Sequence, residues 1–223
     1  MRLDKFLKDT GYGSRKEVKV LIKQKRVSVN DLVVNNEGVS VDENKDIIKV
    51  DNEQVIYIKY VYIMLNKPQG VVSATTDNVH STVIDLINEF KYLELFPVGR
   101  LDIDTEGLLL ITNDGELSHN LLSPKKHVDK TYLLETDEEL SSLDINKIES
   151  GVMLDNELTL PAKIEKVDNR LYHLTIHEGK FHQIKRMLQA VGNRVVALER
   201  VSFGPLRLDE SLQPGEFREL TAD

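Results

Sequence analysis

The chain has 223 residues, of which 40% are hydrophobic and 30% are charged, and it contains no cysteine. A chain of this length suits one medium domain, or a small module joined to a domain of ordinary size. The lack of cysteine excludes disulfide bonds, thiolate metal sites and a cysteine nucleophile. The sequence contains no apolar run of about 18 residues, so it predicts no membrane span. Its first residues lack the apolar core of a secretory signal. We therefore expect a cytoplasmic protein.

The net charge of −8 is distributed unevenly along the chain. Residues 1–30 contain nine basic and three acidic side chains, a net charge of +6, so the remaining 193 residues carry −14. A basic segment ahead of an acidic body is typical of a module that binds an anionic polymer. A solvated, lysine-rich helix face explains the charge equally well.

The first 55 residues or so predict two short helices followed by short strands. A helix is expected at 2–8, and Gly11 and Gly13 break it. Ser14 then begins a second helix, with Glu17 at the capping-box spacing. Short strands are predicted at 27–29, 32–34 and 47–50.

The same segment, RLDKFLKDTGYGSRKEVKVLIKQKRVSVND, resembles an S4 domain, a small RNA-binding fold. In that family the two helices present basic side chains to structured RNA. The resemblance implies RNA contacts by the matching residues, which are Arg2, Lys5, Ser14, Arg15, Lys16, Lys23 and Arg26. Contacts of this kind to phosphates position a protein on RNA without reading its sequence.

The chain beyond residue 60 predicts a second domain with more strands than helices. Strands are predicted at 60–65, 71–74, 108–112, 131–135 and 171–176, and helices at 82–90 and 179–191. A turn is expected at 113–115, and Gly192 is expected at the C′ position of the second helix. Strands that interleave irregularly with few helices are typical of the α+β class, with a mixed or antiparallel sheet.

Acidic side chains crowd the segment that follows Arg100, namely Asp102, Asp104 and Glu106. The pattern D-x-D-x-E-G begins like a calcium-binding loop, but the twelfth position should be a bidentate Glu and is Asn113. Two interpretations remain from the residues alone. Acidic loop residues often only cap and turn the chain; alternatively, one of them is a catalytic carboxylate held beside Arg100.

The run GRLDIDTEGLLLITNDG is similar to the signature loop of the RsuA-type branch of pseudouridine synthases. In that family the Asp of the G-R-L-D run is the essential catalytic residue, and its position here is Asp102. Asp104 follows the family pattern without being the catalytic position. Arg100, Thr105 and Gly107 also match the signature.

A lysine falls inside the apolar stripe of the helix predicted at 179–191. Phe181, Ile184, Leu188 and Val191 line that stripe at helical spacing, and Lys185 lies among them. Such a lysine either extends to solvent or pairs with a carboxylate, because an unpaired buried charge is very unfavourable. HQIKRM resembles the family motif whose basic residue pairs with the catalytic Asp. Many relatives carry Arg there, and Lys cannot make the bidentate fork of Arg.

A third match is Lys130-Thr131-Tyr132, since in the family this Tyr packs on the target base. From the residues alone, Tyr132 reads as an ordinary half-buried strand tyrosine. The runs 201–206 and 212–220 also match, so the resemblance extends from Arg2 to about Leu220. Three histidines, His173, His177 and His182, lack the spacing of a metal site, and no phosphate-binding glycine motif is present. We expect neither a metal nor a cofactor.

The resemblance implies a reaction that breaks the C1′–N1 bond of a uridine, turns the uracil and rejoins it through C5. Asp102 would either attack C1′ or remove a proton from C2′ to give a glycal, and the sequence leaves both open. Both roles need the ionised carboxylate, which the Lys185 cation would stabilise. The uridine must be flipped out to be reached. The implied substrate contacts are Arg100, Thr105, Tyr132 and Lys185.

Together these patterns predict an α+β protein with an S4-like RNA-binding domain at 1–58 and a catalytic domain at 60–223. We expect the catalytic domain to have a mixed, largely antiparallel sheet flanked by helices. The expected substrate is one uridine of small-subunit (16S) ribosomal RNA, because HQIKRM and PGEFREL resemble the small-subunit enzymes more than their large-subunit relatives. The alternatives are a large-subunit (23S) target and a non-catalytic RNA-binding or ribosome-assembly factor. The expected partner is ribosomal RNA or an assembly intermediate, bound by a monomer that contacts no membrane.

Overall fold

The computed structural model describes residues 1–123, 126 and 128–221. The chain divides into two compact units. Unit 1 comprises Met1–Val61 and Ile87–Leu95, and unit 2 comprises Tyr62–Leu86 and Phe96–Asp223. Among the described residues, no helix has the length and apolar character needed to cross a membrane.

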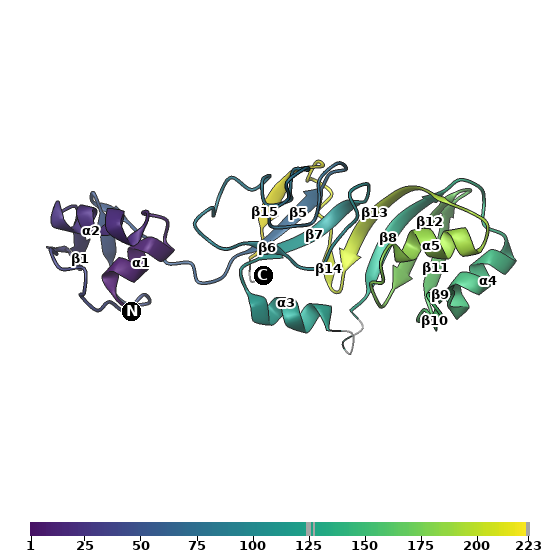
Figure 1. The fold of residues 1–223 in the computed structure, drawn as a ribbon, viewed down its shortest axis with the longest axis horizontal. Coiled ribbons are helices and arrows are strands. Elements are labelled where there is room, and N and C mark those ends of the chain that lie inside the picture. The colour runs from purple at the N-terminus through teal and green to yellow at the C-terminus, as the bar shows by residue number, and fades with distance from the viewer. Residues whose placement is uncertain (124–125, 127, 222–223) are drawn as a thin grey trace. The chain divides into compact units, whose positions relative to one another are not determined.

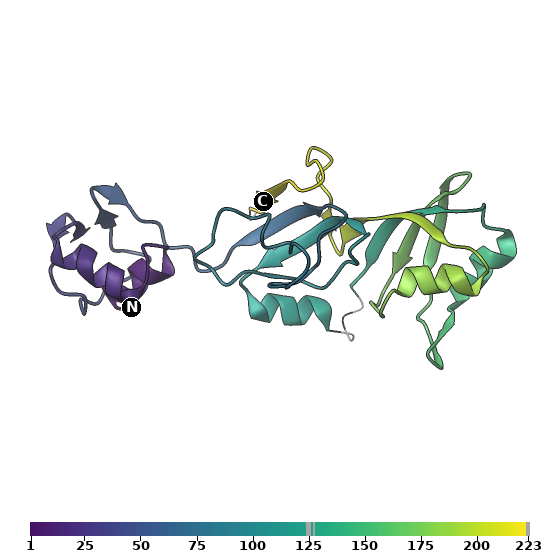
Figure 2. The ribbon, with the colours of Figure 1, turned by 45° about the horizontal axis from the view of Figure 1, so that its top comes forward.

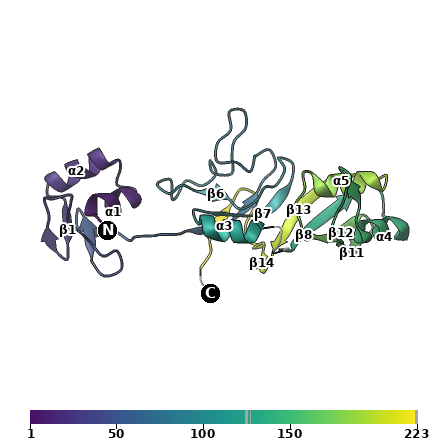
Figure 3. The same cartoon turned by 60° about the horizontal axis from the view of Figure 1, so that its bottom comes forward.

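Unit 1 contains two short helices that pack together beside a small antiparallel sheet (Figure 3). Its core includes Leu3 and Phe6 from the first helix and Val18 and Ile22 from the second, all of them buried. The elements are α1 (Leu3–Asp9), α2 (Arg15–Lys23), β1 (Val27–Val29), β2 (Leu32–Val33), β3 (Ile48–Val50) and β4 (Glu53–Gln54), with the sheet order β2-β1-β3-β4.

The predicted capping box at the start of α2 is confirmed. Ser14 Oγ accepts a hydrogen bond from the backbone N–H of Glu17, and the Glu17 carboxylate accepts one from the backbone N–H of Ser14 at 2.7 Å. The Ser14 hydroxyl also donates to the same carboxylate at 2.7 Å. The hydroxyl that the S4 resemblance assigns to RNA is therefore occupied in stabilising the helix terminus.

Unit 2 is built on one mixed sheet with the strand order β11-β12-β8-β13-β7-β5-β15, with β14 paired to β13 and β6 to β7. Every pairing is antiparallel except that of β13 with β7, so the predicted α+β fold with a largely antiparallel sheet is confirmed. The strands are β5 (Tyr62–Lys67), β6 (Phe96–Pro97), β7 (Glu106–Thr112), β8 (Lys130–Thr136), β11 (Lys163–Asp168), β12 (Leu171–Ile176), β13 (Val195–Phe203), β14 (Leu206–Arg207) and β15 (Phe217–Glu219). A separate hairpin pairs β9 (Met153–Leu154) with β10 (Glu157–Leu158).

Among the described residues, helices α3, α4 and α5 flank this sheet (Figure 1). α3 (Gly115–Leu122) packs through Leu121 against the β7 residues Leu108 and Leu110. α4 (Ser142–Ser150) contacts β11, and α5 (Gln183–Ala190) contacts β13 (Figure 2). α3 and α4 were not among the predicted helices; the predicted turn at 113–115 instead contains the N-cap of α3, where the Asp114 side chain accepts from two backbone N–H groups.

The helix predicted at 82–90 and the strand predicted at 71–74 are both wrong. Thr82 and Asp85 exchange the hydrogen bonds of a helix cap, but they close only one turn. Thr82 is held in an isolated parallel bridge with Val72, which is the only pairing that the 71–74 segment makes among the described residues. The Ser73 hydroxyl bonds the backbone of Leu101 instead, so tertiary contacts override the local pattern of both segments.

The last helix begins four residues later than the predicted start at Gly179. His182 precedes α5 with a left-handed backbone, φ 47°, and no helix continues through it. The Gln183 side chain accepts from the backbone N–H of Lys180 at 2.9 Å, which fixes the loop before the helix. Phe181 therefore lies outside the helix and is 74% exposed, so it does not belong to the apolar stripe predicted for it. Gly192 follows the C-cap with φ 78°, as its predicted C′ position requires.

Candidate active site

Asp102 lies in the loop between β6 and β7. This loop ends where β7 begins to pair with the parallel strand β13. The backbone N–H of Thr105 donates to the carbonyl of Asp102 at 3.1 Å and closes a tight turn. Gly107 follows with φ 98°, and a Cβ there would lie 2.4 Å from the carbonyl oxygen of Arg200. Only glycine permits this approach of β7 to β13, so the G of the T-E-G run sets the position of the loop.

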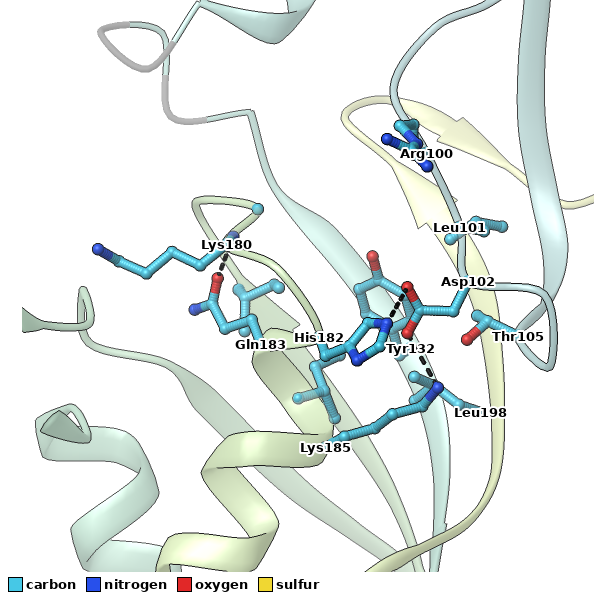
Figure 4. A pocket seen from close by; sticks show the side chains of 13 residues that line it. Arg100, Leu101, Asp102, Thr105, Tyr132, Lys180, His182, Gln183, Lys185 and Leu198 are labelled. Carbon is cyan, nitrogen blue, oxygen red and sulfur yellow. Dashed lines mark hydrogen bonds and ion pairs between the residues drawn. The ribbon is translucent and has the colours of Figure 1, made fainter. Parts of the chain in front are cut away.

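Lys185 reaches from α5 to this loop and pairs with Asp102 (Figure 4). It also pairs with Asp104 of the same loop. Its Nζ lies 2.9 Å from Asp102 Oδ2 and 2.6 Å from Asp104 Oδ1. Burial lowers the pKa of Lys185, but the hydrogen bonds to the two carboxylates outweigh it and raise that pKa. Burial raises the pKa of Asp104, yet Lys185 outweighs this and leaves it below its ordinary value. The group is thus a cation shared by two carboxylates.

His182 is a second basic group beside Asp102. Its Nε2 lies 3.6 Å from Asp102 Oδ1, and its ring stacks on Phe181 with the centroids 3.8 Å apart. The sequence suggested His182 only as a possible metal ligand. Its place beside the carboxylate depends on the left-handed turn before α5, which no pattern in the sequence indicates.

Tyr132 forms part of the wall of the pocket that contains Asp102 (Figure 4). It lies on β8 opposite Leu174 of β12 and Arg200 of β13, and it is 7% exposed. The pocket is small, about 90 Å³, and Lys185 and Leu198 also line it. It opens into a larger groove of about 1080 Å³, which shares Asp102, Tyr132 and Lys185 with it.

Lys67 is a functional candidate that the sequence analysis missed. It is completely buried at the end of β5, and its Nζ donates to the carbonyls of Pro68 at 2.9 Å and Thr105 at 2.8 Å. The carbonyl of Ile103 lies 3.5 Å away. Lys67 therefore holds the backbone of the Asp102 loop. Burial lowers its pKa to about 8 despite the nearby carboxylates. A lysine at the end of the apolar run YIMLN was the available signal.

The two remaining predicted substrate contacts differ in exposure. Thr105 is 2% exposed, and its hydroxyl has no hydrogen-bond partner among the described residues. Arg100 is exposed at the edge of the groove and lies apart from the Asp102 carboxylate (Figure 4). The cation that pairs with Asp102 is Lys185. The hypothesis that Arg100 holds the catalytic carboxylate therefore named the wrong cation.

The predicted RNA-binding cations of unit 1 lie on its surface, and several pair with acids of the same unit. Arg2 pairs with Asp4 at 2.9 Å, Lys5 pairs with Asp9, and Arg26 pairs with Asp51 at 2.5 Å. Lys23 is exposed at the end of α2. A groove in this unit is lined by Met1, Arg2, Asp4, Lys5, Arg15, Lys16 and Lys19.

The segment that would complete a calcium loop is strand β7, which runs from Glu106 to Thr112. Within the described parts of the chain, no three His, Asp or Glu side chains are grouped as a metal site requires. The acidic residues around Asp102 are instead arranged around the Lys185 ammonium group.

Comparisons with known proteins assign this architecture. Residues 61–190 match the family model described as RNA pseudouridylate synthase, and residues 1–47 match the S4 domain. The chain belongs to the RNA pseudouridine synthases. It carries an S4 domain ahead of its catalytic domain, and the predicted family resemblance is confirmed.

Relatives align with this synthase along its whole length. It is 49% identical to an RNA pseudouridine synthase of Bacillus subtilis named YtzG, over 100% of this chain and 96% of that protein. It is 44% identical to the ribosomal small subunit pseudouridine synthase A of Vibrio vulnificus, over 100% of this chain and 97% of that protein. A crystal structure of a pseudouridylate synthase superposes with a TM-score of 0.70 and 39% identity, covering 99% of this chain and 96% of the other. The synthase is therefore an isomerase that acts on RNA.

Proposed function

We propose that Asp102 is the catalytic carboxylate of this synthase and that its substrate is one uridine of small-subunit (16S) ribosomal RNA. The observation that carries the catalytic assignment is the ion pair of Asp102 with Lys185 at 2.9 Å, on the wall of a pocket that Tyr132 also lines. One carboxylate, one fixed cation and one aromatic face around a single cavity meet the needs of the reaction. The uracil must leave C1′, turn, and return through C5 within one enclosed space.

Each side chain then has one task. The Lys185 ammonium pairs with the Asp102 carboxylate and fixes its position. The Asp102 carboxylate attacks C1′ or removes the proton from C2′, and either route releases the uracil from C1′. Tyr132 offers a stacking face to the flipped base. When C5 bonds to C1′, the C5 proton is lost and N1 gains one, so the isomerisation needs no external oxidant or reductant.

The remaining contacts are assigned by position. Arg100, exposed at the edge of the groove, contacts the RNA backbone, and Thr105 lines the pocket beside Asp102. In the domain proposed at 1–58, Arg2, Lys5, Arg15, Lys16, Lys23 and Arg26 contact phosphates. The catalytic domain is proposed at 60–223. We propose that the synthase works as a monomer in the cytoplasm.

The small-subunit target is supported by relatives that align over the full chain. The Vibrio vulnificus and Yersinia pestis proteins, 44% and 42% identical, are both named ribosomal small subunit pseudouridine synthase A. The experiment is pseudouridine mapping of both ribosomal RNAs from cells with and without the gene. An Asp102→Asn copy and a matched Asp104→Asn copy are returned to the deleted cells, because Lys185 bonds both carboxylates.

The expected result is the loss of one small-subunit site that the Asp104→Asn copy restores and the Asp102→Asn copy does not. Loss of a large-subunit site keeps the chemistry and corrects the target. If the Asp102→Asn copy restores the lost site, Asp102 is not the catalytic residue. If no site changes, a non-catalytic role in ribosome assembly becomes the better account.

A further inference from the structure

Four side chains share one face of the sheet within the groove that contains Asp102. Lys130 and Tyr132 are two residues apart on β8, so they point to the same side. In β13, Arg200 lies directly opposite Tyr132 and Phe203 lies directly opposite Lys130. All four line the same groove as Asp102.

Arg200 is a buried cation with an incomplete set of partners. It is 2% exposed, and its Nε donates to the carbonyl of Leu108 at 2.8 Å. Its Cζ lies 5.1 Å from the centroid of the Phe203 ring. Its Nη2 has no hydrogen-bond partner among the described residues. A buried donor without a partner is destabilising, and more so when it is charged, so this arginine calls for a role beyond packing.

Lys130 is a second cation beside the same ring. Its Nζ lies 5.4 Å from the Phe203 centroid and donates to the carbonyl of Val128 at 2.7 Å. Burial and the Arg200 charge lower the pKa of Lys130. The neighbouring carboxylate, Asp129, bonds His177 at 2.7 Å, and within the described chain no ion pair joins Lys130 or Arg200 to an acid. The buried Arg200 and the half-buried Lys130 are therefore cations without a bonded anion in the described chain.

We propose that Lys130 and Arg200 bind a phosphodiester group of the RNA strand next to the target uridine. This rests on the proposed function, in which the uridine lies between Asp102 and Tyr132. Lys130 is two strand residues, roughly 7 Å, from Tyr132 along β8. The groove, about 1080 Å³, exceeds the roughly 300–1,000 Å³ of small-molecule sites and has room for more than the flipped nucleoside.

A phosphate satisfies both cations. Its oxygens accept from a guanidinium and from an ammonium at once, and charge-assisted bonds of this kind are about twice as strong as neutral ones. Bound there, it also offsets the repulsion between Lys130 and Arg200. The flanking phosphate thereby fixes the strand beside the pocket, and the two residues act as binding and positioning residues that do not touch the reacting atoms.

The test compares Lys130→Gln with Lys163→Gln, an exposed control on β11 that removes the same charge from the same unit. The substrate is total ribosomal RNA from cells that lack the gene and were grown with [5-³H]uridine, since C5–C1′ bond formation releases the label. We expect Lys130→Gln to raise KM about tenfold with kcat within about twofold. The slope of log(1/KM) against log[salt] should become shallower by about 0.7–0.9, as expected for one lost phosphate contact, and Lys163→Gln should match the wild type.

A neutral phosphate then identifies the ligand. In a short RNA that carries the mapped uridine, each flanking phosphate is replaced in turn by a methylphosphonate. One replacement should weaken binding to the wild type as much as Lys130→Gln does, and the Lys130→Gln protein should not respond to that replacement. Arg200→Lys should keep more of the affinity than Arg200→Met.

An unchanged KM and salt slope in Lys130→Gln overturn the proposal, as does a loss confined to kcat. The proposal would also be overturned if every methylphosphonate weakened binding of the Lys130→Gln protein as much as it weakens binding of the wild type. Lys130 would then contact something other than a phosphate. A wild-type protein that releases no tritium would instead contradict the proposed function.

Discussion

The cations of the two units are held in opposite ways. In unit 1, Arg2, Lys19 and Arg26 lie on the surface and pair with acids of the same unit. In unit 2, Lys67 and Arg200 are buried against backbone carbonyls, and Lys185 bridges two aspartates. The pairs of Lys19 and Arg26 are exposed and contribute little to stability, so phosphates can replace their acids at little cost, whereas Asp4, the partner of Arg2, is itself buried. Buried cations cannot exchange partners so easily, which makes them suited to fixing geometry.

This comparison indicates that the surface cations determine the affinity for RNA and the buried cations determine the position of the reacting groups. Surface cations supply salt-sensitive attraction to any RNA backbone. Buried cations set where one carboxylate and one nucleotide lie. Changes at Asp102 and at the residues that hold its loop should therefore act on the rate of the chemical step. Changes on the surface of unit 1, like those at the proposed phosphate contacts of Lys130 and Arg200, should act on the concentration of RNA required. The following variants test this division, from the largest expected effect to the smallest.

Asp102→Asn should lower kcat by at least about 10³-fold, because the amide neither attacks C1′ nor removes a proton. The measurement is tritium release from [5-³H]uridine-labelled ribosomal RNA. Asp104→Asn, which removes the other carboxylate bonded by Lys185, should keep kcat within about tenfold. Equal losses in both variants would contradict the separate roles of the two aspartates.

Lys67→Met should lower kcat by about 10²-fold with KM nearly unchanged, since a loop displaced by about 1 Å can cost that much. The ammonium group holds the carbonyls of Pro68 and Thr105, and methionine leaves both without that donor. Kinetics and thermal unfolding are measured together on the full chain. A rise in KM alone would assign Lys67 to RNA binding instead.

The same variant isolates a pH dependence of stability. Burial lowers the pKa of Lys67 to about 8 in the folded protein, below its unfolded value of about 10.4. Between these values the unfolded chain binds one more proton than the folded chain, so the free energy of unfolding rises with pH. The wild type should therefore gain stability relative to Lys67→Met from about pH 8 to 10.4. A constant difference over this range would show that Lys67 keeps its ordinary pKa.

The combined change of Arg15, Lys16 and Lys23 to Gln should raise KM about tenfold or more and leave kcat within about twofold. The slope of log(1/KM) against log[salt] should become shallower by about 2.1–2.7, because each of the three lost phosphate contacts accounts for about 0.7–0.9. The matched control changes Lys147, Lys163 and Lys166 to Gln, three exposed residues of unit 2. An equal rise in KM for the control would mean that net charge, and not the S4 surface, sets the affinity.

Short-range signals in the sequence predicted much of this structure. The capping box of Ser14 and Glu17 begins α2 as predicted, and the alternating run Leu171–Ile176 is strand β12. The family resemblance selected Asp102 and Lys185, which the structure brings within 2.9 Å. These features depend on residues close in sequence, or on a motif learned from other chains.

The features that were missed depend on long-range contacts. Thr82 and Asp85 form a helix cap, yet the bridge to Val72 prevents the helix that they favour. Lys67 bonds Thr105, which is 38 residues away, and Arg200 bonds Leu108, which is 92 residues away. No local pattern in the sequence distinguishes such buried cations from surface ones. Their roles follow only from the strand pairing that the structure shows.

The smallest expected effect compares the two capping boxes, one in each unit. Ser14 with Glu17 begins α2, and Ser141 with Asp144 begins α4 by the same exchange of hydrogen bonds. Ser14→Ala and Ser141→Ala should each lower the free energy of unfolding of their own unit by about 1 kcal/mol. Hydrogen exchange of the α2 and α4 amides measures each loss locally.

Because the Ser14 hydroxyl bonds Glu17, Ser14→Ala should change KM no more than about twofold. If Ser14→Ala instead raises KM about tenfold with α2 fully protected, while Ser141→Ala does not, the Ser14 hydroxyl leaves its cap to contact RNA.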